Sequence, residues 1–311
     1  MAILIKAPEP DDCIVVPNRI ALIDADVVAY YSSFGLDEYP ATAAETKCWQ
    51  RCQQIEQETQ AKYFRYYLTG SYENNFRTSL ARLKRYKGDR YDENSNRLKD
   101  QPKWLQHVRQ WLITNKAAQT AEFQEADDAI SIAAATIRAD GNYESCISTV
   151  DKDLGINPGW FHNQMHNTVE MITPFGELCL IKKFKKDETK SSHASLKGNG
   201  MKFFYAQLLM GDPTDWIPGL PKVSDYQYQE FGCRRGGCGP KAAFLTLETA
   251  EDDQECLRRV MTSYKSYWEG KTWADWREPD KLLEADWKEM LIEQGRLLWM
   301  RRKEGEMWQL A

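Results

Sequence analysis

The sequence has no long apolar run. No stretch of its 311 residues approaches the roughly 18 consecutive apolar residues that a membrane-spanning helix needs. The first twenty residues carry Glu9, Asp11 and Asp12 where a signal peptide has an uninterrupted apolar block. We therefore expect a cytoplasmic protein with no membrane partner.

Cysteine and histidine are sparse, with 8 and 4 residues respectively. The cysteines show no dense framework, which argues against a disulfide-stabilised fold and favours free thiols. Cys233 and Cys238 are spaced C-x4-C, but no matched second pair follows, so structural zinc is the less favoured interpretation. Neither a G-x-S-x-G elbow nor a Walker loop occurs, so serine hydrolases and P-loop ATPases have no support.

The chain also lacks an excess of positive charge. Its net charge is −5, which taken alone argues against a nucleic-acid partner. The basic residues are nevertheless concentrated in two stretches, FRTSLARLKRYKGDR and IKKFKKDETK. They are Arg77, Arg82, Lys84, Arg85, Lys87 and Arg90 in the first, and Lys182, Lys183, Lys185, Lys186 and Lys190 in the second. A solvated surface is the alternative interpretation of either stretch alone.

What the sequence does have is four acidic clusters, most of them where an apolar run ends or a helix begins. They are Asp24 and Asp26 in LIDAD, Glu125, Asp127 and Asp128 in EADD, Asp151 and Asp153 in VDKD, and Asp212 and Asp215 in GDPTD. Buried like charges repel, so a fold that gathers these carboxylates needs cations between them. Paired divalent ions with oxygen ligands commonly drive in-line attack on phosphodiesters. The clusters therefore predict a magnesium-dependent nuclease.

Each cluster also has a purely structural interpretation. An aspartate of LIDAD is a good N-cap for the next helix, and the acids of EADD complement a helix dipole. VDKD and GDPTD are typical of surface turns. We expect Asp151 and Asp153 to alternate on an extended segment and to point to the same side, and Glu125 and Asp128 to share one helical face.

Alternating apolar runs and helical periodicities predict an α/β core with a parallel or mixed sheet. Strands are expected at 20–23, 66–68 and 146–150, with a hairpin formed by 168–173 and 177–181. Helical spacing covers 41–67, 104–115, 126–139 and 200–211, and an acidic helical tail follows from about residue 250. We expect a catalytic domain over residues 1–195 and a helical DNA-binding region over 196–311.

A glycine-rich turn precedes a helix at Gly236-Gly237-Cys238-Gly239-Pro240-Lys241. It has the shape of a helix-hairpin-helix turn. Glycines let a backbone approach phosphate closely, and the N-terminus of the following helix offers free N–H groups.

The order of these parts resembles the 5′ nuclease family of flap endonucleases and 5′→3′ exonucleases, within the PIN-like superfamily. LIDADVVAY resembles its first-strand aspartate motif, FRTSLARLKRYKGDR its arch segment, and EADD and STVDKDL its next two metal motifs. LLMGDPTDWIPGLP followed by GCGPKAA resembles the region after them, so the similarity covers about residues 18–247. The closing MLIEQGRLLWMRRKEGEMWQL is similar to the tail of short podophage exonucleases, which indicates a phage replication or recombination nuclease in the host cytoplasm.

The resemblance implies a central mixed, mostly parallel sheet flanked by helices, with a helical arch at about residues 74–100 and a C-terminal helix-hairpin-helix region. It assigns one of two Mg²⁺ or Mn²⁺ ions to Asp24, Glu125, Asp127 and Asp128, and the second to Asp151, Asp153, Asp212 and Asp215. Lys87 and Arg90 match catalytic cations that stabilise the scissile phosphate.

The same resemblance implies DNA contacts and a partner. The contacts would come from Arg77, Arg82, Lys84, Arg85 and Tyr86, and from Gly236, Gly237, Gly239 and Lys241, with K⁺ on the carbonyl oxygens of the turn as an optional addition. The partner would be DNA with a free 5′ end, in the form of a duplex, a flap or a nicked strand. An RNA:DNA hybrid would be a further substrate, and the protein would act as a monomer.

Three positions depart from the family. Gly70 stands where the family has an aspartate seven residues before the arch arginine, with Glu73 the nearest acid. Trp216 replaces an asparagine, and an insertion separates PGLPK from GCGPK. Two alternatives therefore stay open: a PIN-like ribonuclease, and a non-catalytic DNA-structure binder with an incomplete metal site.

Overall fold

The structure is a computed structural model that describes residues 4–6, 14–70, 75–90, 100–183 and 193–310. The chain divides into two compact units. The first comprises residues 1–76, 97–173 and 300–306, and the second residues 77–96, 174–299 and 307–311. Within the described ranges, no helix is long and apolar enough to cross a membrane. The catalytic and DNA-binding roles assigned to residues 1–195 and 196–311 stay predictions.

The first unit is built on a seven-stranded sheet with the order β1-β7-β6-β5-β2-β3-β4. The strands are β1 (Leu4–Lys6), β2 (Val16–Asp24), β3 (Ala61–Thr69), β4 (Gln119–Ala121), β5 (Glu144–Thr149), β6 (Gly159–Asn163) and β7 (Thr168–Ile172). The five strands from β6 to β4 run parallel, whereas β7 is antiparallel to both β6 and β1. The predicted α/β class with a mostly parallel sheet is confirmed.

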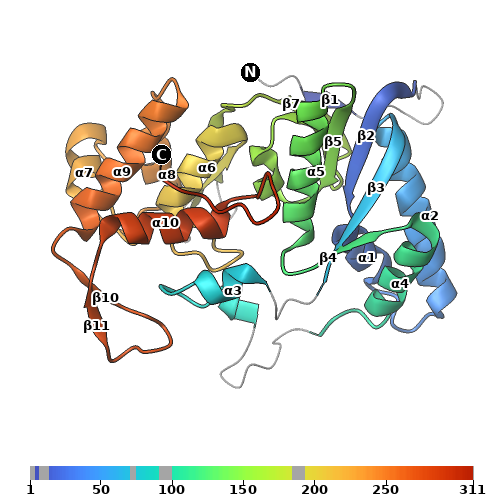
Figure 1. The fold of residues 1–311 in the computed structure, drawn as a ribbon, viewed down its shortest axis with the longest axis horizontal. Coiled ribbons are helices and arrows are strands. Elements are labelled where there is room, and N and C mark those ends of the chain that lie inside the picture. Colours follow the sequence, from blue (N-terminus) through green and yellow to red (C-terminus); the bar gives the residue numbers. More distant parts are fainter. Residues whose placement is uncertain (1–3, 7–13, 71–74, 91–99, 184–192, 311) are drawn as a thin grey trace. The chain divides into compact units, whose positions relative to one another are not determined.

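Helices cover both faces of this sheet (Figure 1). They are α1 (Ala25–Ser33), α2 (Ala41–Glu58) and α4 (Leu105–Lys116) on one face and α5 (Ala126–Asp140) on the other. The pleat of β2 explains its unbroken apolar run, because successive side chains point to opposite faces. Ala21 and Ile23 pack with the first three helices, whereas Leu22 is fully buried on the side where α5 packs.

The strand order reverses beside β2. From β2 the chain extends the sheet through β3 to β4, and then returns to place β5 on the other side of β2. In open α/β sheets, ligands bind outside the carboxyl ends of the strands at such a switch point. A ligand site is therefore expected at the residues that end β2 and β5.

One expected helix boundary and one expected hairpin are wrong. Helix α2 ends at Glu58 and does not continue to 67, because β3 begins at Ala61. The first half of β3 is largely exposed and lacks the alternation of buried and exposed residues that marks a strand in sequence. The hairpin of 168–173 with 177–181 does not form, because β7 pairs with β6 and β1, and β8 (Leu178–Lys183) pairs with β9 (His193–Gly198). The residue expected at the hairpin turn, Gly176, packs instead against the backbone of Asn199.

The second unit is mainly helical (Figure 1). Its elements are α3 (Phe76–Leu80, from Arg77 on), the β8–β9 hairpin, α6 (Gly200–Met210), α7 (Asp225–Phe231), α8 (Pro240–Leu247), α9 (Asp253–Trp268), a second hairpin of β10 (Thr272–Ala274) and β11 (Leu282–Glu284), and α10 (Trp287–Leu298). Helix α6 is buried along almost its whole length, and α8, α9 and α10 pack around it. The hydroxyl of Tyr264 donates to the Leu208 carbonyl at 2.6 Å, which fixes α9 on α6.

A tight loop follows α6 and carries the fourth acidic cluster. Asp212 and Ile217 exchange two backbone hydrogen bonds of 2.9 Å. Gly219 closes the loop with φ +62°, and a Cβ there would lie 2.2 Å from the backbone nitrogen of Gly211. Gly232 has nearly the same φ, +61°, but a Cβ there would meet nothing within 4 Å.

These two glycines give a matched test of the loop. We expect Gly219→Ala to lower the free energy of unfolding by roughly 2 kcal/mol more than Gly232→Ala. Both variants force an alanine into the left-handed region of φ, but only at residue 219 must the new Cβ also push neighbouring backbone atoms away. Urea unfolding of the two variants measures the difference. Equal losses would show that the loop does not depend on this close approach.

Candidate functional site

Asp24 ends β2 at the switch point, and only 5% of its surface is exposed. One carboxylate oxygen accepts hydrogen bonds from the N–H groups of Asp26 at 3.1 Å and Val27 at 3.3 Å, so Asp24 is the N-cap of α1. The other oxygen accepts from the Thr149 hydroxyl, at the end of β5, at 2.7 Å. The capping role is therefore real, but it leaves Asp24 facing the end of β5 as well.

The charge of Asp24 is destabilised where it lies. Burial, with smaller contributions from the neighbouring carboxylates of Asp26 and Asp151, raises the pKa of Asp24 from 3.8 to about 7. Hydrogen bonds from Thr149 and Val27 oppose this rise without cancelling it. Three carboxylates thus act on one another at the carboxyl edge of the sheet, and a bound cation would favour their ionised forms.

Asp26, in the first turn of α1, connects this helix to α4 and to the end of β3. Its carboxylate accepts from the Thr69 N–H at 2.8 Å and forms an ion pair with Arg109 of α4, which also donates to the Thr69 carbonyl. The Thr69 hydroxyl accepts from the Ala126 N–H, at the first residue of α5, at 3.0 Å. Sequence analysis missed Arg109 and Thr69, because neither stands out from an ordinary helix surface or strand end.

VDKD follows β5, but its predicted geometry is wrong. Asp151 caps a 3-10 helix, Lys152–Ile156, and accepts from the Asp153 N–H at 2.8 Å. The segment is therefore helical instead of extended, because the aspartate cap turns the chain. The Asp151 N–H donates to the hydroxyl of Thr149 at 3.0 Å, so this threonine contacts both Asp24 and Asp151. Asp153 is 7% exposed.

EADD begins α5, as predicted. Asp128 is fully buried and accepts from the N–H groups of Glu125 at 3.4 Å and Arg301 at 3.2 Å. Glu125 and Asp128 form a capping box, so the capping interpretation accounts for Asp128. Glu125 is 3% exposed, and Asp127 is half-buried.

Across the described residues, no three Asp, Glu, His or Cys side chains form a group that could hold a metal ion as they stand. The donors at this edge are carboxylate and hydroxyl oxygens, which suit Mg²⁺ or Mn²⁺ and not zinc. Such an ion would relieve the electrostatic repulsion between Asp24 and its neighbouring carboxylates. The residues therefore fit a hard divalent cation by their chemistry.

In the second unit, Asp215 collects the residues of the YKGDR segment. Its carboxylate accepts from the Tyr86 hydroxyl at 2.9 Å and pairs with Arg90 at 3.1 Å and Lys87 at 3.6 Å. Its backbone carbonyl accepts from the Lys87 N–H at 2.9 Å. The two cations assigned to catalysis thus lie together on one carboxylate that was itself assigned to a metal.

Trp216, one of the departures from the family, packs on the same segment. A Cβ on Gly88 would lie 2.5 Å from the Trp216 ring, and the Lys84 ammonium lies 4.4 Å from the centre of that ring. The tryptophan therefore covers the backbone between the two catalytic candidates, where only glycine fits. Asp212 is 1% exposed and accepts from the Thr214 N–H at 2.9 Å.

Arg77 was assigned to DNA, but the structure places it elsewhere. It is 1% exposed, and its guanidinium donates to the carbonyls of Leu297 and Trp299 at 2.9 Å each. These carbonyls end α10 and need donors. We therefore leave Arg77 out of the DNA-contacting surface.

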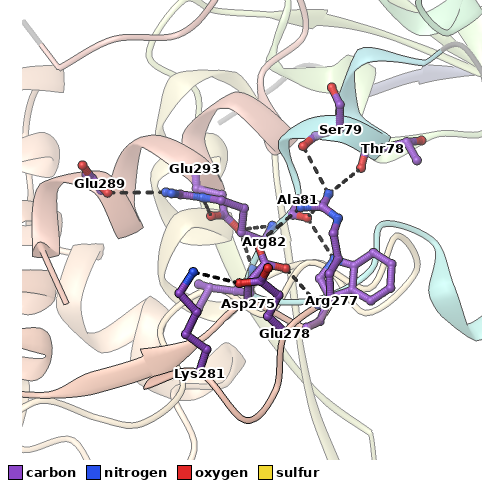
Figure 2. Close-up of polar contacts among 12 residues, drawn as sticks. Thr78, Ser79, Ala81, Arg82, Asp275, Arg277, Glu278, Lys281, Glu289 and Glu293 are labelled. Carbon is purple, nitrogen blue, oxygen red and sulfur yellow. Dashed lines mark hydrogen bonds and ion pairs between the residues drawn. The ribbon is translucent and has the colours of Figure 1, made fainter. Parts of the chain in front are cut away.

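Arg82 is likewise engaged inside the unit (Figure 2). It pairs with Glu293 at 3.1 Å and Glu289 at 3.6 Å on α10, and its N–H donates to Glu293 at 2.9 Å. Beside it, Arg277 donates to the carbonyls of Thr78, Ser79 and Ala81 at 3.2, 3.2 and 2.9 Å. The β10–β11 hairpin, which sequence analysis missed, thus fixes the segment that leads to YKGDR.

The glycine-rich turn joins α7 to α8. The insertion before GCGPK contains α7, which explains this departure from the family. A Cβ on Gly236, Gly237 or Gly239 would meet nothing within 4 Å, and no side chain caps the first turn of α8. Lys241 is exposed on that turn. The exposed backbone and free helix N-terminus suit an anion.

The zinc alternative gains no support at this turn. Cys233 and Cys238 are both buried; Cys233 donates to the Ala242 carbonyl, and Gln227 donates to the Cys238 sulfur. Their role is packing between α7 and α8. Of the second basic stretch, Lys185, Lys186 and Lys190 lie outside the described residues, as do Glu73 and positions 91–99 of the predicted arch.

A scan against protein-family models found no match, and neither did a search of curated proteins. Among solved structures, the chain is similar to the D15 flap endonuclease of bacteriophage T5, a 5′ nuclease. A T5 D15 structure co-crystallised with metal ions matches with a TM-score of 0.47 and 13% identity, over 79% of this chain and 88% of that one. A complex of a T5 D15 variant with DNA and metal ions matches with a TM-score of 0.47 and 15% identity, over the same shares.

The raised pKa of Asp24 predicts how stability depends on pH. The unfolded carboxyl loses its proton near pH 3.8 and the folded one near pH 7, so in EDTA the wild type loses stability as the pH rises through this range. Asp24→Asn cannot ionise and escapes this loss. We expect the variant to melt on the order of 5 °C above the wild type at pH 8, with little difference at pH 4.

Thermal unfolding in EDTA across this pH range measures the effect. Excess Mg²⁺ at pH 8 should then raise the melting temperature of the wild type by more than that of Asp24→Asn, which keeps the acids proposed for the second ion. A difference between the two proteins that does not vary with pH would contradict a buried, destabilised Asp24 carboxylate.

Proposed function

We propose that this protein is a divalent-metal-dependent 5′ nuclease that hydrolyses DNA phosphodiesters at or near a free 5′ end. The observation that carries the proposal is the set of carboxylates at the switch point of the sheet. Asp24 ends β2, Asp151 follows β5, and their mutual repulsion raises the pKa of a buried carboxyl. Such a site is costly to keep without cations and is suited to holding them.

The first unit supplies most of the proposed ligands. Asp24, Glu125 and Asp127 would hold one ion, and Asp151 and Asp153 would contribute to the second. When bound, paired divalent ions make a water molecule more acidic and stabilise the leaving oxygen. Around them, Thr149 orients Asp24 and Asp151, and Arg109 holds Asp26 against the end of β3. Asp128 contributes through the capping box that fixes the start of α5.

The YKGDR segment supplies the proposed phosphate contacts. Lys87 and Arg90 pair with the Asp215 carboxylate, and a phosphodiester offers the same kind of anionic oxygen acceptor. Asp215 holds the two cations as a pair, so their position is set before DNA binds. We therefore propose that Asp215, and with it the loop that carries Asp212, positions these cations.

Duplex binding is assigned to the turn between α7 and α8. Gly236, Gly237 and Gly239 let a phosphate approach the backbone, and the uncapped N-terminus of α8 and Lys241 attract its charge. Lys84 and Arg85 would extend this contact toward the 5′ end. The absence of a ready-made metal group among the described residues favours one competing function, a DNA-structure binder that does not cleave.

A 5′-flap duplex labelled at each end separates these functions. We expect cleavage at the junction or stepwise from the 5′ end in Mg²⁺ or Mn²⁺, and none in EDTA. The product ladder distinguishes endonuclease from exonuclease action. Binding without cleavage in either metal would establish the non-catalytic alternative, and cleavage confined to an RNA substrate of the same shape would establish the ribonuclease.

Lys87→Ala tests the proposed phosphate contact. We expect single-turnover cleavage to fall by about 100-fold, because one preorganised charge is lost, while the dissociation constant for the flap changes by less than about threefold. Lys281→Ala is the matched control, since that lysine pairs only with Glu278 within the described contacts of this unit. Parallel losses of binding and cleavage would reduce Lys87 to a phosphate anchor.

A further inference from the structure

Arg277 follows β10 and binds the end of α3 in the same unit (Figure 2). Its guanidinium donates to the carbonyls of Thr78, Ser79 and Ala81 at 3.2, 3.2 and 2.9 Å. The last carbonyls of a helix have no partners within that helix, so Arg277 supplies donors that α3 lacks. Asp275 orients this arginine, since its carboxylate accepts from the Arg277 backbone N–H at 2.9 Å and from its guanidinium at 3.3 Å.

The same hairpin and α10 hold the two residues that follow. The backbone N–H of Trp276 donates to the Arg82 carbonyl at 3.0 Å. One carboxylate oxygen of Glu293, on α10, accepts from the backbone N–H groups of Arg82 at 2.9 Å and Leu83 at 2.8 Å. The backbone over residues 78–83 is therefore fixed by the β10–β11 hairpin and α10 together.

Lys87, which follows this fixed segment, has an unusual backbone conformation. Its φ is +52°, in the left-handed region that residues other than glycine rarely adopt. Trp216, which packs on the neighbouring Gly88, lies in the same region with φ +61°. Such conformations persist only where the surrounding structure fixes them from several sides. The Lys87 N–H donates to the Asp215 carbonyl at 2.9 Å, which fixes the turn on one side, and residues 78–83 fix the chain that enters it.

We propose that Arg277 is a positioning residue for Lys87. By holding the end of α3, it restricts the chain that leads to Lys87 and so keeps this lysine beside Asp215 in its left-handed conformation. The inference rests on the proposed function, in which Lys87 stabilises the scissile phosphate. Arg277 acts through the backbone, and its loss displaces a group whose position controls the rate of cleavage.

Hydrogen exchange of the full-length protein without DNA tests the positioning by itself. In Arg277→Ala, the backbone amides of residues 84–90 should exchange at least about tenfold faster than in the wild type. Arg277→Lys keeps the charge but not the planar fork that reaches several carbonyls, and should fall between the two. Lys281→Ala, which removes a cation from the same hairpin, should exchange as the wild type does. Melting temperatures in EDTA verify that all four proteins are folded.

A double-mutant cycle then tests whether Arg277 acts through Lys87. In single-turnover cleavage of the 5′-flap duplex, we expect Arg277→Ala to lower the rate by about tenfold while the dissociation constant changes by less than about threefold. In a Lys87→Ala background, the same substitution should lower the rate by less than about twofold, because the group that Arg277 positions is already absent. Arg277→Lys should recover part of the rate, and Lys281→Ala should cleave as the wild type does.

The outcomes separate this inference from the function on which it rests. Unchanged exchange over residues 84–90 in Arg277→Ala would overturn the inference, whether or not the protein cleaves DNA. An active wild type in which Arg277→Ala slows cleavage equally with and without Lys87 would overturn the inference and leave the proposed function in place. A wild type that cleaves no substrate would overturn both.

Discussion

The structure depends on a single buried carboxylate at the place where the sheet reverses its order. Asp24 caps α1 with one oxygen and accepts from Thr149 of β5 with the other, so it joins a helix to two neighbouring strands. Burial and neighbouring acids make its charge unfavourable, and its pKa rises to about 7. The fold needs this carboxylate for its hydrogen bonds, yet its negative charge is unfavourable there. A bound cation would offset that charge and complete the site. Asp26, Asp151 and the start of α5 are connected to this edge by hydrogen bonds with Thr69 and Thr149.

In the second unit, a carboxylate likewise fixes the side chains around it, and here these include two cations. Asp215 gathers Tyr86, Lys87 and Arg90, and Trp216 covers the glycine between them. The arginines that flank this segment serve the fold, since Arg77 binds carbonyls at the end of α10 and Arg82 pairs with Glu293. The basic residues of this stretch therefore divide into those that serve the fold and the pair held by Asp215, for which we propose contact with phosphate. This division places the proposed chemistry on Lys87 and Arg90.

Much of this could be predicted from sequence where the signal is local. The apolar run before Asp24 and the alanine-rich period of α5 specify their elements, and acids at the ends of such elements indicate a site. Roles that depend on pairing between distant strands left no such signal. Thr149 contacts Asp24 across 125 positions, and the backbone pairing of Gly70 with Ala121 leaves no room for a Cβ at residue 70. The β6–β7 pairing was missed because β6, a strand of five residues, was not expected, and the β10–β11 hairpin because its strands are only three residues long.

The central claim is that the carboxyl edge around Asp24 binds divalent ions. A crystal structure of the protein grown with Mn²⁺, with data collected for anomalous scattering, tests it most directly. The account predicts an anomalous peak at a coordinating distance of about 2.2 Å from an Asp24 oxygen, with further carboxylates of the same edge around it. Ordered Mn²⁺ only at other surfaces, with the Asp24 carboxyl still bound to Thr149 alone on that side, would contradict it.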